Sequence, residues 1–225
     1  MSDETTFNVQ LDPLEARVFG VLVEKALTTP EQYPLSLNAV TNGANQKSNR
    51  EPVLSLDEVE VAGALGRLES KYMVRKVFPG GSRVEKYCHN GKDALNLDSK
   101  ALGVLAELLM RGPQTPGDLR ARANRMAPIP SLADLLAVLD QLMARGLVRR
   151  LEPVPGSRAE RYVQLLSPDL HPLEPPAGAY ASTERPSTAA ASPGLAERVQ
   201  ALEGEVERLR QHVRTLAERL GVVLE

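Results

Sequence analysis

The chain contains one short motif twice: GSRVEKY begins at Gly81 and GSRAERY begins at Gly156. The match extends upstream, where LGRLESKYMVRKV at 65–77 aligns with LDQLMARGLVRRL at 139–151. An internal repeat constrains the fold strongly, because each copy must form the same structural unit. Each copy is too long for a solenoid repeat and has the size of a small domain. The sequence therefore predicts two similar domains, each with its own core.

In the first copy the sequence predicts three helices. Asp12 followed by Pro13 is typical of a helix start, and apolar residues then recur at spacings of three and four. A second helix is expected from Ser36 to the Asn-Gly pair at 42–43. The SLDE segment at 55–58 matches a capping box and opens a third helix. This third helix is expected to bury one stripe, formed by Val59, Ala62, Leu65 and Leu68.

The second copy repeats this plan, with helices that start at Ser99, Thr115 and Ser131. The first of these helices is expected to end before Gly112 and the third at Gly146. Glycine commonly follows the last turn of a helix, because it adopts the left-handed conformation without strain.

After the third helix of each copy, the sequence predicts a β-hairpin. A short apolar strand, MVRKVF or LVRRL, is followed by a Pro/Gly turn and an alternating return strand. Gly81 and Gly156 can adopt the positive φ that a tight turn needs. Three helices followed by a hairpin form a winged helix. We therefore expect a mainly α fold with small β-hairpins, made of two tandem winged-helix (helix-turn-helix) domains at 1–95 and 96–167.

The rest of the chain is expected to be a linker and a coiled coil. The Pro/Ala/Ser-rich segment at 168–194 has no apolar periodicity, which is typical of a linker. At 195–225, valine at the a positions and leucine at the d positions favour a parallel two-stranded coiled coil and hence a homodimer. The alternative is a single amphipathic helix that folds back on the domains. The predicted dimer contacts are Leu195, Val199, Leu202, Val206, Leu209, Val213, Leu216 and Leu220.

Composition limits the compartment and the class of partner. A net charge of -2 and a pI near 6.0 do not favour a general polyanion binder. The single cysteine, Cys88, rules out an internal disulfide and fits a reducing compartment. The acidic N-terminus lacks the signal-peptide pattern, and no apolar run reaches the roughly 20 residues of a membrane span. We therefore expect a cytoplasmic protein with no membrane partner.

The sequence does not point to catalysis. His89, His171 and His212 are not spaced as metal ligands, and neither a dinucleotide-binding motif nor a P-loop motif is found. Cys88 is either a packed strand residue or a reactive thiol, and no partner for a catalytic triad is visible. We therefore expect a non-enzymatic protein without cofactor, metal or small-molecule substrate.

Polar residues that could contact DNA or a protein partner fall in three groups. They are the polar loop at 42–52, the two hairpins, and the second copy, where arginines outnumber acids between 111 and 161. Simpler interpretations are a solvated loop, a polar pair that fixes the hairpin and a solvated helix face. The predicted contact residues are Asn45, Gln46, Lys47, Asn49, Arg50, Arg83, Lys86, Arg120, Arg122, Arg125, Arg158 and Arg161.

Three segments together resemble the YceH-like family of bacterial proteins: LNAVTNGANQKSNREPV at 37–53, KYMVRKVFPGGSRVEKYCHN at 71–90, and RGPQTPGDLRARANRM at 111–126. The polar run at 45–50 is the most specific part, since generic winged helices have nothing like it. The resemblance covers nearly the whole chain. It implies a tandem winged-helix fold of uncharacterised function, and it supplies no catalytic or ligand-binding residues.

Two functional hypotheses follow from the sequence. A DNA-reading helix presents basic or amide side chains, but here the third helices carry Asp57, Glu58 and Glu60 in one copy and Asp134 and Asp140 in the other. The first hypothesis is a DNA-binding or transcription-associated protein that contacts the DNA backbone, and fold base rates favour it slightly. The second is a protein-interaction module or scaffold resembling chromosome-condensation accessory subunits, which the acidic helices favour.

Overall fold

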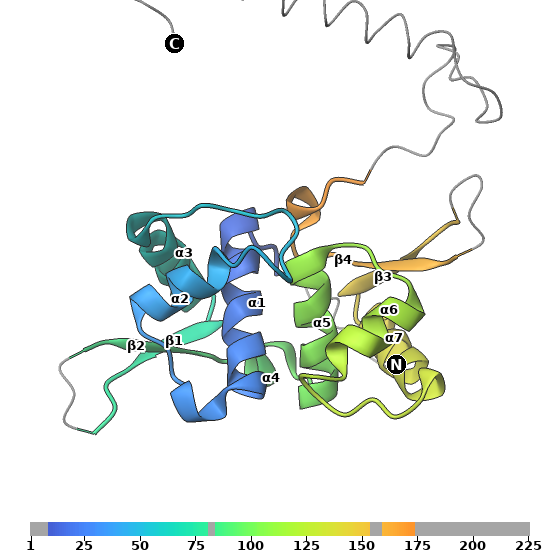
Figure 1. The fold of residues 1–225 in the computed structure, drawn as a ribbon, viewed down its shortest axis with the longest axis horizontal. Coiled ribbons are helices and arrows are strands. Elements are labelled where there is room, and N and C mark those ends of the chain that lie inside the picture. Colours follow the sequence, from blue (N-terminus) through green and yellow to red (C-terminus); the bar gives the residue numbers. More distant parts are fainter. Residues whose placement is uncertain (1–8, 81–83, 154–158, 174–225) are drawn as a thin grey trace, which may run out of the picture. The chain divides into compact units, whose positions relative to one another are not determined.

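The computed structural model describes residues 9–80, 84–153 and 159–173 (Figure 1). The first repeat contains, in order, α1 (Pro13–Thr28), α2 (Leu37–Ala44), α3 (Glu58–Ser70), β1 (Val74–Val77) and β2 (Lys86–His89). The second repeat contains α5 (Ser99–Arg111), α6 (Pro116–Ala123), α7 (Leu132–Ala144), β3 (Val148–Leu151) and β4 (Arg161–Gln164). The described residues are therefore mainly helical with two small antiparallel β-hairpins, as the sequence predicts.

Three short elements lie outside this repeated plan and were not predicted. They are the 3₁₀ turns η1 (Pro30–Gln32) and η2 (Pro168–Leu170), and the helix α4 (Gly91–Leu95) that connects the repeats. Elements of one turn contain too few residues to show a periodic pattern, so the sequence gives no signal for them.

Most helix starts follow from local capping. Asp12 accepts hydrogen bonds from the amides of Leu14 and Glu15, and the Glu15 carboxylate accepts from the Asp12 amide. Thr115 caps α6 and Ser131 caps α7 through bonds to backbone amides three residues on. These starts are confirmed, because a cap needs only residues within one helical turn.

The third helix of the first repeat starts later than predicted. Asp57 is its N-cap, and the capping box joins Asp57 to Glu60. Val59 is 80% exposed, and the buried stripe is Val61, Ala64, Leu65 and Leu68. Burial of Leu65 and Leu68 is confirmed, but Val59 and Ala62 are exposed, because steps of three drift around a helix of about 3.6 residues per turn. Val59 therefore lies on the side opposite Leu68.

The repeated motif places one tyrosine at the same site in each repeat. Tyr87 on β2 exchanges two backbone hydrogen bonds with Leu35, just before α2, at 2.7 and 3.1 Å. Tyr162 on β4 does the same with Gln114, just before α6, at 2.9 and 3.1 Å. Both tyrosine side chains are buried. Each hairpin is therefore attached to its own helices, whereas the predicted turn residues Gly81 and Gly156 lie outside the described residues.

The two repeats share one hydrophobic core, although the sequence predicted two. Helices α1 and α5 pack side by side at its centre (Figure 1). Phe19 and Leu22 of α1 belong to the same buried cluster as Leu105 and Leu109 of α5. Both helices have long unbroken runs of buried residues, which is expected of helices enclosed on all sides. The ranges 1–95 and 96–167 therefore correspond to repeats but not to separate cores.

The chain after β4 packs back onto the body. The amide of Leu11 donates to the carbonyl oxygen of Leu166 at 2.7 Å, and Leu170 and His171 are buried. His171 lies against Gly112, which has a φ of 72° and leaves no room for a Cβ atom there. The start of the predicted linker at 168 is therefore part of the packed structure. None of the helices in the described ranges has the length and apolar character that a membrane crossing needs.

Candidate functional site

The polar loop between α2 and α3 is held by its own side chains. The side-chain Nδ2 of Asn45 donates to the carbonyl oxygen of Leu56 at 2.7 Å, and the backbone amide of Leu56 donates to the side-chain Oδ1 of Asn45 at 2.8 Å. Arg17 on α1 donates to the carbonyl oxygen of Glu51 at 3.1 Å. The Glu51 amide donates to Met110 on α5 at 2.7 Å. The loop therefore bridges the two central helices, and Asn45 makes an internal clamp.

Arg50, expected at the surface, is enclosed in the structure. Its Nη2 atom lies 2.5 Å from Oε2 of Glu24, and the two side chains are 0% and 2% exposed. Its Nε atom donates to the carbonyl oxygen of Gly43 at 3.0 Å. A buried guanidinium requires such partners, because leaving one charge unpaired in the interior is costly. Arg50 thus fixes the loop to α1.

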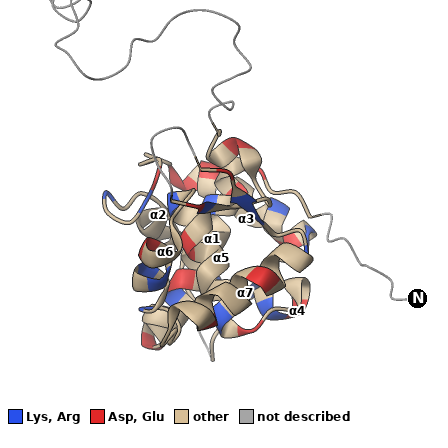
Figure 2. Cartoon of the chain, turned by 90° about the vertical axis from the view of Figure 1, so that its right-hand side faces the viewer, with Lys and Arg blue, Asp and Glu red and all other residues tan. Residues whose placement is uncertain are grey.

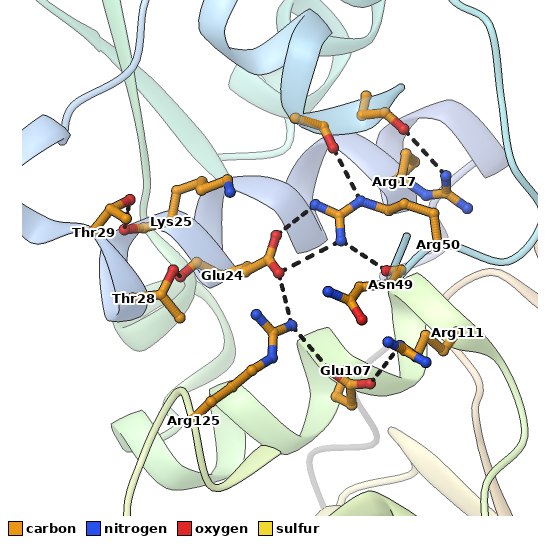
Figure 3. Close-up of polar contacts among 12 residues, drawn as sticks. Arg17, Glu24, Lys25, Thr28, Thr29, Asn49, Arg50, Glu107, Arg111 and Arg125 are labelled. Carbon is orange, nitrogen blue, oxygen red and sulfur yellow. Dashed lines mark hydrogen bonds and ion pairs between the residues drawn. The ribbon is translucent and has the colours of Figure 1, made fainter. Parts of the chain in front are cut away.

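A chain of ion pairs continues from Glu24 into the second repeat (Figure 3). The Nη2 atom of Arg125 lies 2.7 Å from Glu24 and 3.3 Å from Glu107 on α5. The Nε atom of Arg111 lies 3.1 Å from the other oxygen of Glu107. We call Glu24, Arg50, Glu107, Arg111 and Arg125 the junction network. In this network the guanidinium of Arg125 contacts one carboxylate from each central helix, Glu24 on α1 and Glu107 on α5.

The environment favours the charged forms of Glu24 and Arg125. Burial by itself would raise the pKa of Glu24, but the hydrogen bonds and charges of Arg50 and Arg125 outweigh burial and lower it. Burial by itself would lower the pKa of Arg125, and Glu24 and Glu107 together raise it. The pKa of Arg17 falls to about 10, through burial first and the charge of Arg50 second.

Sequence reasoning missed Arg17, Glu24, Glu107 and Arg111. A signal for them was present, because Arg17 and Glu24 flank the apolar run at 18–23 of α1. They are separated by about two helical turns and so share one face of α1. Charged residues inside such a helix are expected to have buried partners.

The other predicted contact residues fall into three sets: those with internal contacts, those described by exposure alone, and those outside the described ranges. Arg120 donates to the carbonyl oxygen of Pro130 at 2.9 Å, and Arg122 donates to the side-chain oxygen of Gln114 at 2.7 Å. Lys47 is exposed. Gln46, Asn49, Lys86 and Arg161 are partly buried. The following lie outside the described residues: Arg83, Arg158, and the predicted dimer contacts at 195–220.

The outward faces of α3 and α7 carry small, apolar and acidic side chains. On α7, Leu132 is 47% and Leu136 is 37% exposed, while Asp140 is also exposed. On α3, Val59 and Glu58 are exposed. Major-groove readout needs hydrogen-bonding or cationic groups at such positions. Besides carboxylates, these faces offer few such groups: Gln141 is an exposed amide on α7, and Arg67 on α3 is paired with Asp12 and Glu15.

Basic side chains occur at matching positions of the two hairpins. Arg75 on β1 and Arg149 on β3 are exposed. The next residues along the strands form ion pairs with carboxylates: Lys76 lies 3.7 Å from Glu85, and Arg150 lies 3.2 Å from Glu160. Figure 2 shows acidic and basic residues interspersed over this side of the chain. Each hairpin therefore carries a carboxylate beside one of its basic side chains.

A family model described as "Protein of unknown function, DUF480" matches residues 11–170. The chain belongs to the DUF480 family. A UPF0502 protein of Geotalea daltonii is 54% identical over 162 residues, which are 71% of this chain and 74% of the relative. A UPF0502 protein of Aeromonas hydrophila is 44% identical, over 94% of this chain and 96% of the relative. A UPF0502 protein of Shewanella halifaxensis is 45% identical, over 94% of this chain and 100% of the relative. The predicted resemblance to an uncharacterised bacterial family is confirmed.

This DUF480 protein has a packed cysteine and histidine on β2. Cys88 is buried, with its Sγ atom 3.1 Å from Nε of Arg75, which confirms the packed-residue interpretation. His89 accepts a hydrogen bond from the Gly91 amide at 3.2 Å and contacts the Phe19 ring edge-on. Burial, followed by the charges of Lys92 and Arg75, lowers the pKa of His89 to about 4. The ring is therefore neutral and structural at neutral pH.

Proposed function

We propose that this DUF480 protein is a non-enzymatic interaction module whose two winged-helix units present α3 and α7 to a partner protein. The observation that carries the proposal is the chemistry of the outward face of α7. Leu132 and Leu136 are exposed one helical turn apart, with Ala133 and Ala137 beside them. Small residues at this spacing allow the backbone of a partner to approach closely. The apolar side chains then lose contact with water, which favours binding.

The first repeat supports the same proposal at equivalent positions. In the repeat alignment, Val59 matches Ala133 and Gly66 matches Asp140. Val59 is 80% exposed, and a Cβ atom added at Gly66 would meet only open space. Val59 and Ala133 are thus apolar at matching positions, whereas Gly66 matches the acidic Asp140. Neighbouring carboxylates, such as Glu58, would repel phosphates and complement a basic rim on a protein.

DNA binding through the hairpins is the second candidate. The exposed arginines Arg75 and Arg149, at matching positions of the two repeats, favour it. The internal contacts of Arg50, Arg120 and Arg122 weaken it, because these side chains are already bonded within the chain.

We further propose that the protein acts in the cytoplasm as a homodimer. The unbroken valine and leucine heptads at 195–225 support the homodimer, since this pattern favours parallel pairs. Two copies would present two sets of α3 and α7 faces and so raise avidity for a repeated or dimeric partner.

Affinity capture from the native cell tests which surface binds. The bait is the full chain, compared with a double variant of α7, Leu132→Ser with Leu136→Ser, in extract treated with nuclease. The matched control is a hairpin double variant, Arg75→Gln with Arg149→Gln. Binding of each bait to a random-sequence DNA duplex is titrated with salt in parallel, since phosphate contacts weaken steeply as salt rises.

The proposal predicts that one partner protein is captured by the wild-type bait after nuclease treatment. The hairpin variant should still capture it, and the α7 variant should not. Salt-dependent duplex binding that disappears only in the hairpin variant would establish the second candidate instead. Circular dichroism of both variants verifies that they keep the wild-type fold, as expected for substitutions at exposed positions.

A further inference from the structure

Three arginines of the second repeat lie together beside the repeat junction. Arg111 ends α5, Arg122 belongs to α6 and Arg125 follows α6. Arg111 and Arg125 contact the same carboxylate, that of Glu107. The pKa of Arg111 is lowered by burial first and, against the attraction of Glu107, by the charges of Arg122, Arg125 and Arg50. We call Arg111, Arg122 and Arg125 the arginine cluster.

Positive charge exceeds negative charge around this cluster. With Arg50 the cluster supplies four positive charges, and Glu24 and Glu107 supply two negative ones, which leaves an excess of two. Among the described residues, the side chain of Arg122 donates to the neutral side chain of Gln114 and to no carboxylate. Both carboxylates are at most 2% exposed, while the side chains of Arg111 and Arg125 are 24% and 36% exposed. Solvent therefore meets guanidinium groups with the carboxylates beneath them.

Most N–H groups of the cluster are still available. Among the described residues, the polar contacts use Nε of Arg111, Nη1 of Arg122 and Nη2 of Arg125. The other guanidinium nitrogens make no hydrogen bond or ion pair with those residues.

We propose that the arginine cluster binds a phosphate group, supplied by inorganic phosphate or a small phosphate ester. A dianion matches the excess of two positive charges, and guanidinium forks match phosphate oxygens in bidentate geometry. The partial burial of the cluster favours a small ligand over a nucleic-acid duplex. Because Arg125 also holds Glu24 on α1, a bound phosphate stabilises the junction between the repeats. The proposal is independent of the partner surface on α3 and α7.

Calorimetry and thermal unfolding of the full chain test this site. The probes are inorganic phosphate, glycerol phosphate and a short DNA duplex, each compared with chloride at equal ionic strength because exposed charges are screened by salt. Arg122→Gln is the main variant, since its one internal partner is neutral. Arg122→Lys keeps the charge but loses the fork. Arg149→Gln, on the exposed face of β3, is the control.

The wild-type chain should bind phosphate and melt at a higher temperature with phosphate than with chloride. Arg122→Gln should weaken phosphate binding about tenfold or more, because a charge-assisted bond is lost, and Arg149→Gln should leave it unchanged. Stronger binding of glycerol phosphate than of inorganic phosphate would identify an ester as the ligand. The proposal is overturned if phosphate acts on the wild type no differently from chloride, if only the duplex binds, or if Arg149→Gln weakens phosphate binding equally. If Arg122→Gln does not fold, the comparison of phosphate with chloride and with the duplex on the wild-type chain still tests the proposal.

Discussion

Glu24 on α1 and Arg125 after α6 form an ion pair of 2.7 Å that joins the two repeats. Arg125 also contacts Glu107 on α5 at 3.3 Å, so one guanidinium holds a carboxylate on each central helix. Since neither glutamate is more than 2% exposed, the arginines offset the cost of burying each carboxylate. The repeats are therefore held together by a polar network as well as by a shared apolar core.

The buried pair in the first repeat should contribute strongly to stability. Replacing Arg50 with Leu should lower the free energy of unfolding by about 3–5 kcal/mol, because Glu24 loses its closest partner. The double variant Arg50→Leu with Glu24→Leu should recover much of this loss, since no unpaired charge remains. Urea unfolding at neutral pH measures both.

Arg67→Leu is the control for this pair. Arg67 forms its ion pairs with a side chain that is 48% exposed, so the change should cost less than about 1 kcal/mol. An Arg50→Leu effect as small as that of Arg67→Leu would contradict the importance of the junction network.

Two equivalent turns carry different residues at the same left-handed conformation. Tyr72 follows α3 with a φ of 58°, and Gly146 follows α7 with a φ of 67°. Tyr72→Gly should raise the free energy of unfolding by about 0.5–1 kcal/mol, because relief of backbone strain exceeds the added chain entropy. Gly146→Ala should lower it by about 1–2 kcal/mol. Chemical denaturation of both variants measures this, and changes of equal sign would exclude the strain explanation.

Stability should fall in mild acid because of His89. Its pKa is depressed to about 4 in the folded chain and is near 6.5 when unfolded. Its contribution is therefore complete above about pH 6.5 and is lost as the pH falls toward 4, by up to about 3 kcal/mol. His171 shifts in the same direction, with burial as the main cause, and adds to the loss.

His89→Asn separates this contribution from the others. Asparagine keeps an acceptor for the Gly91 amide but does not titrate. Urea unfolding at about pH 7 and about pH 5 should show a smaller difference for the variant than for the wild type, because one linked proton is removed. An unchanged difference would assign the acid sensitivity to other groups.

The coiled-coil prediction concerns residues beyond those the structure describes. The molecular mass of the protein in solution tests it. Leu202→Asp with Leu209→Asp places charges at two d positions and should convert the homodimer to a monomer in sedimentation equilibrium. Gly204→Ala, at a position predicted to face outward, should keep the dimer and add about 1 kcal/mol of helix propensity. A wild-type chain that sediments as a monomer would favour the folded-back helix.

The amino-acid sequence alone determined the repeat, the order of the elements in each copy and most helix starts. Asp12, Thr115 and Ser131 cap their helices through residues within one turn, so their role depends on local sequence only.

Only the tertiary structure decided that two repeats build one core and that Arg50 is buried in it. These outcomes depend on the packing of α1 against α5 and on a loop that reaches across both, which are contacts between residues far apart in the chain. A polar side chain is expected at the surface, but a guanidinium can be buried where a carboxylate and a carbonyl oxygen replace its water partners. Whether such partners arrive is set by how distant surfaces dock, and no local pattern encodes that.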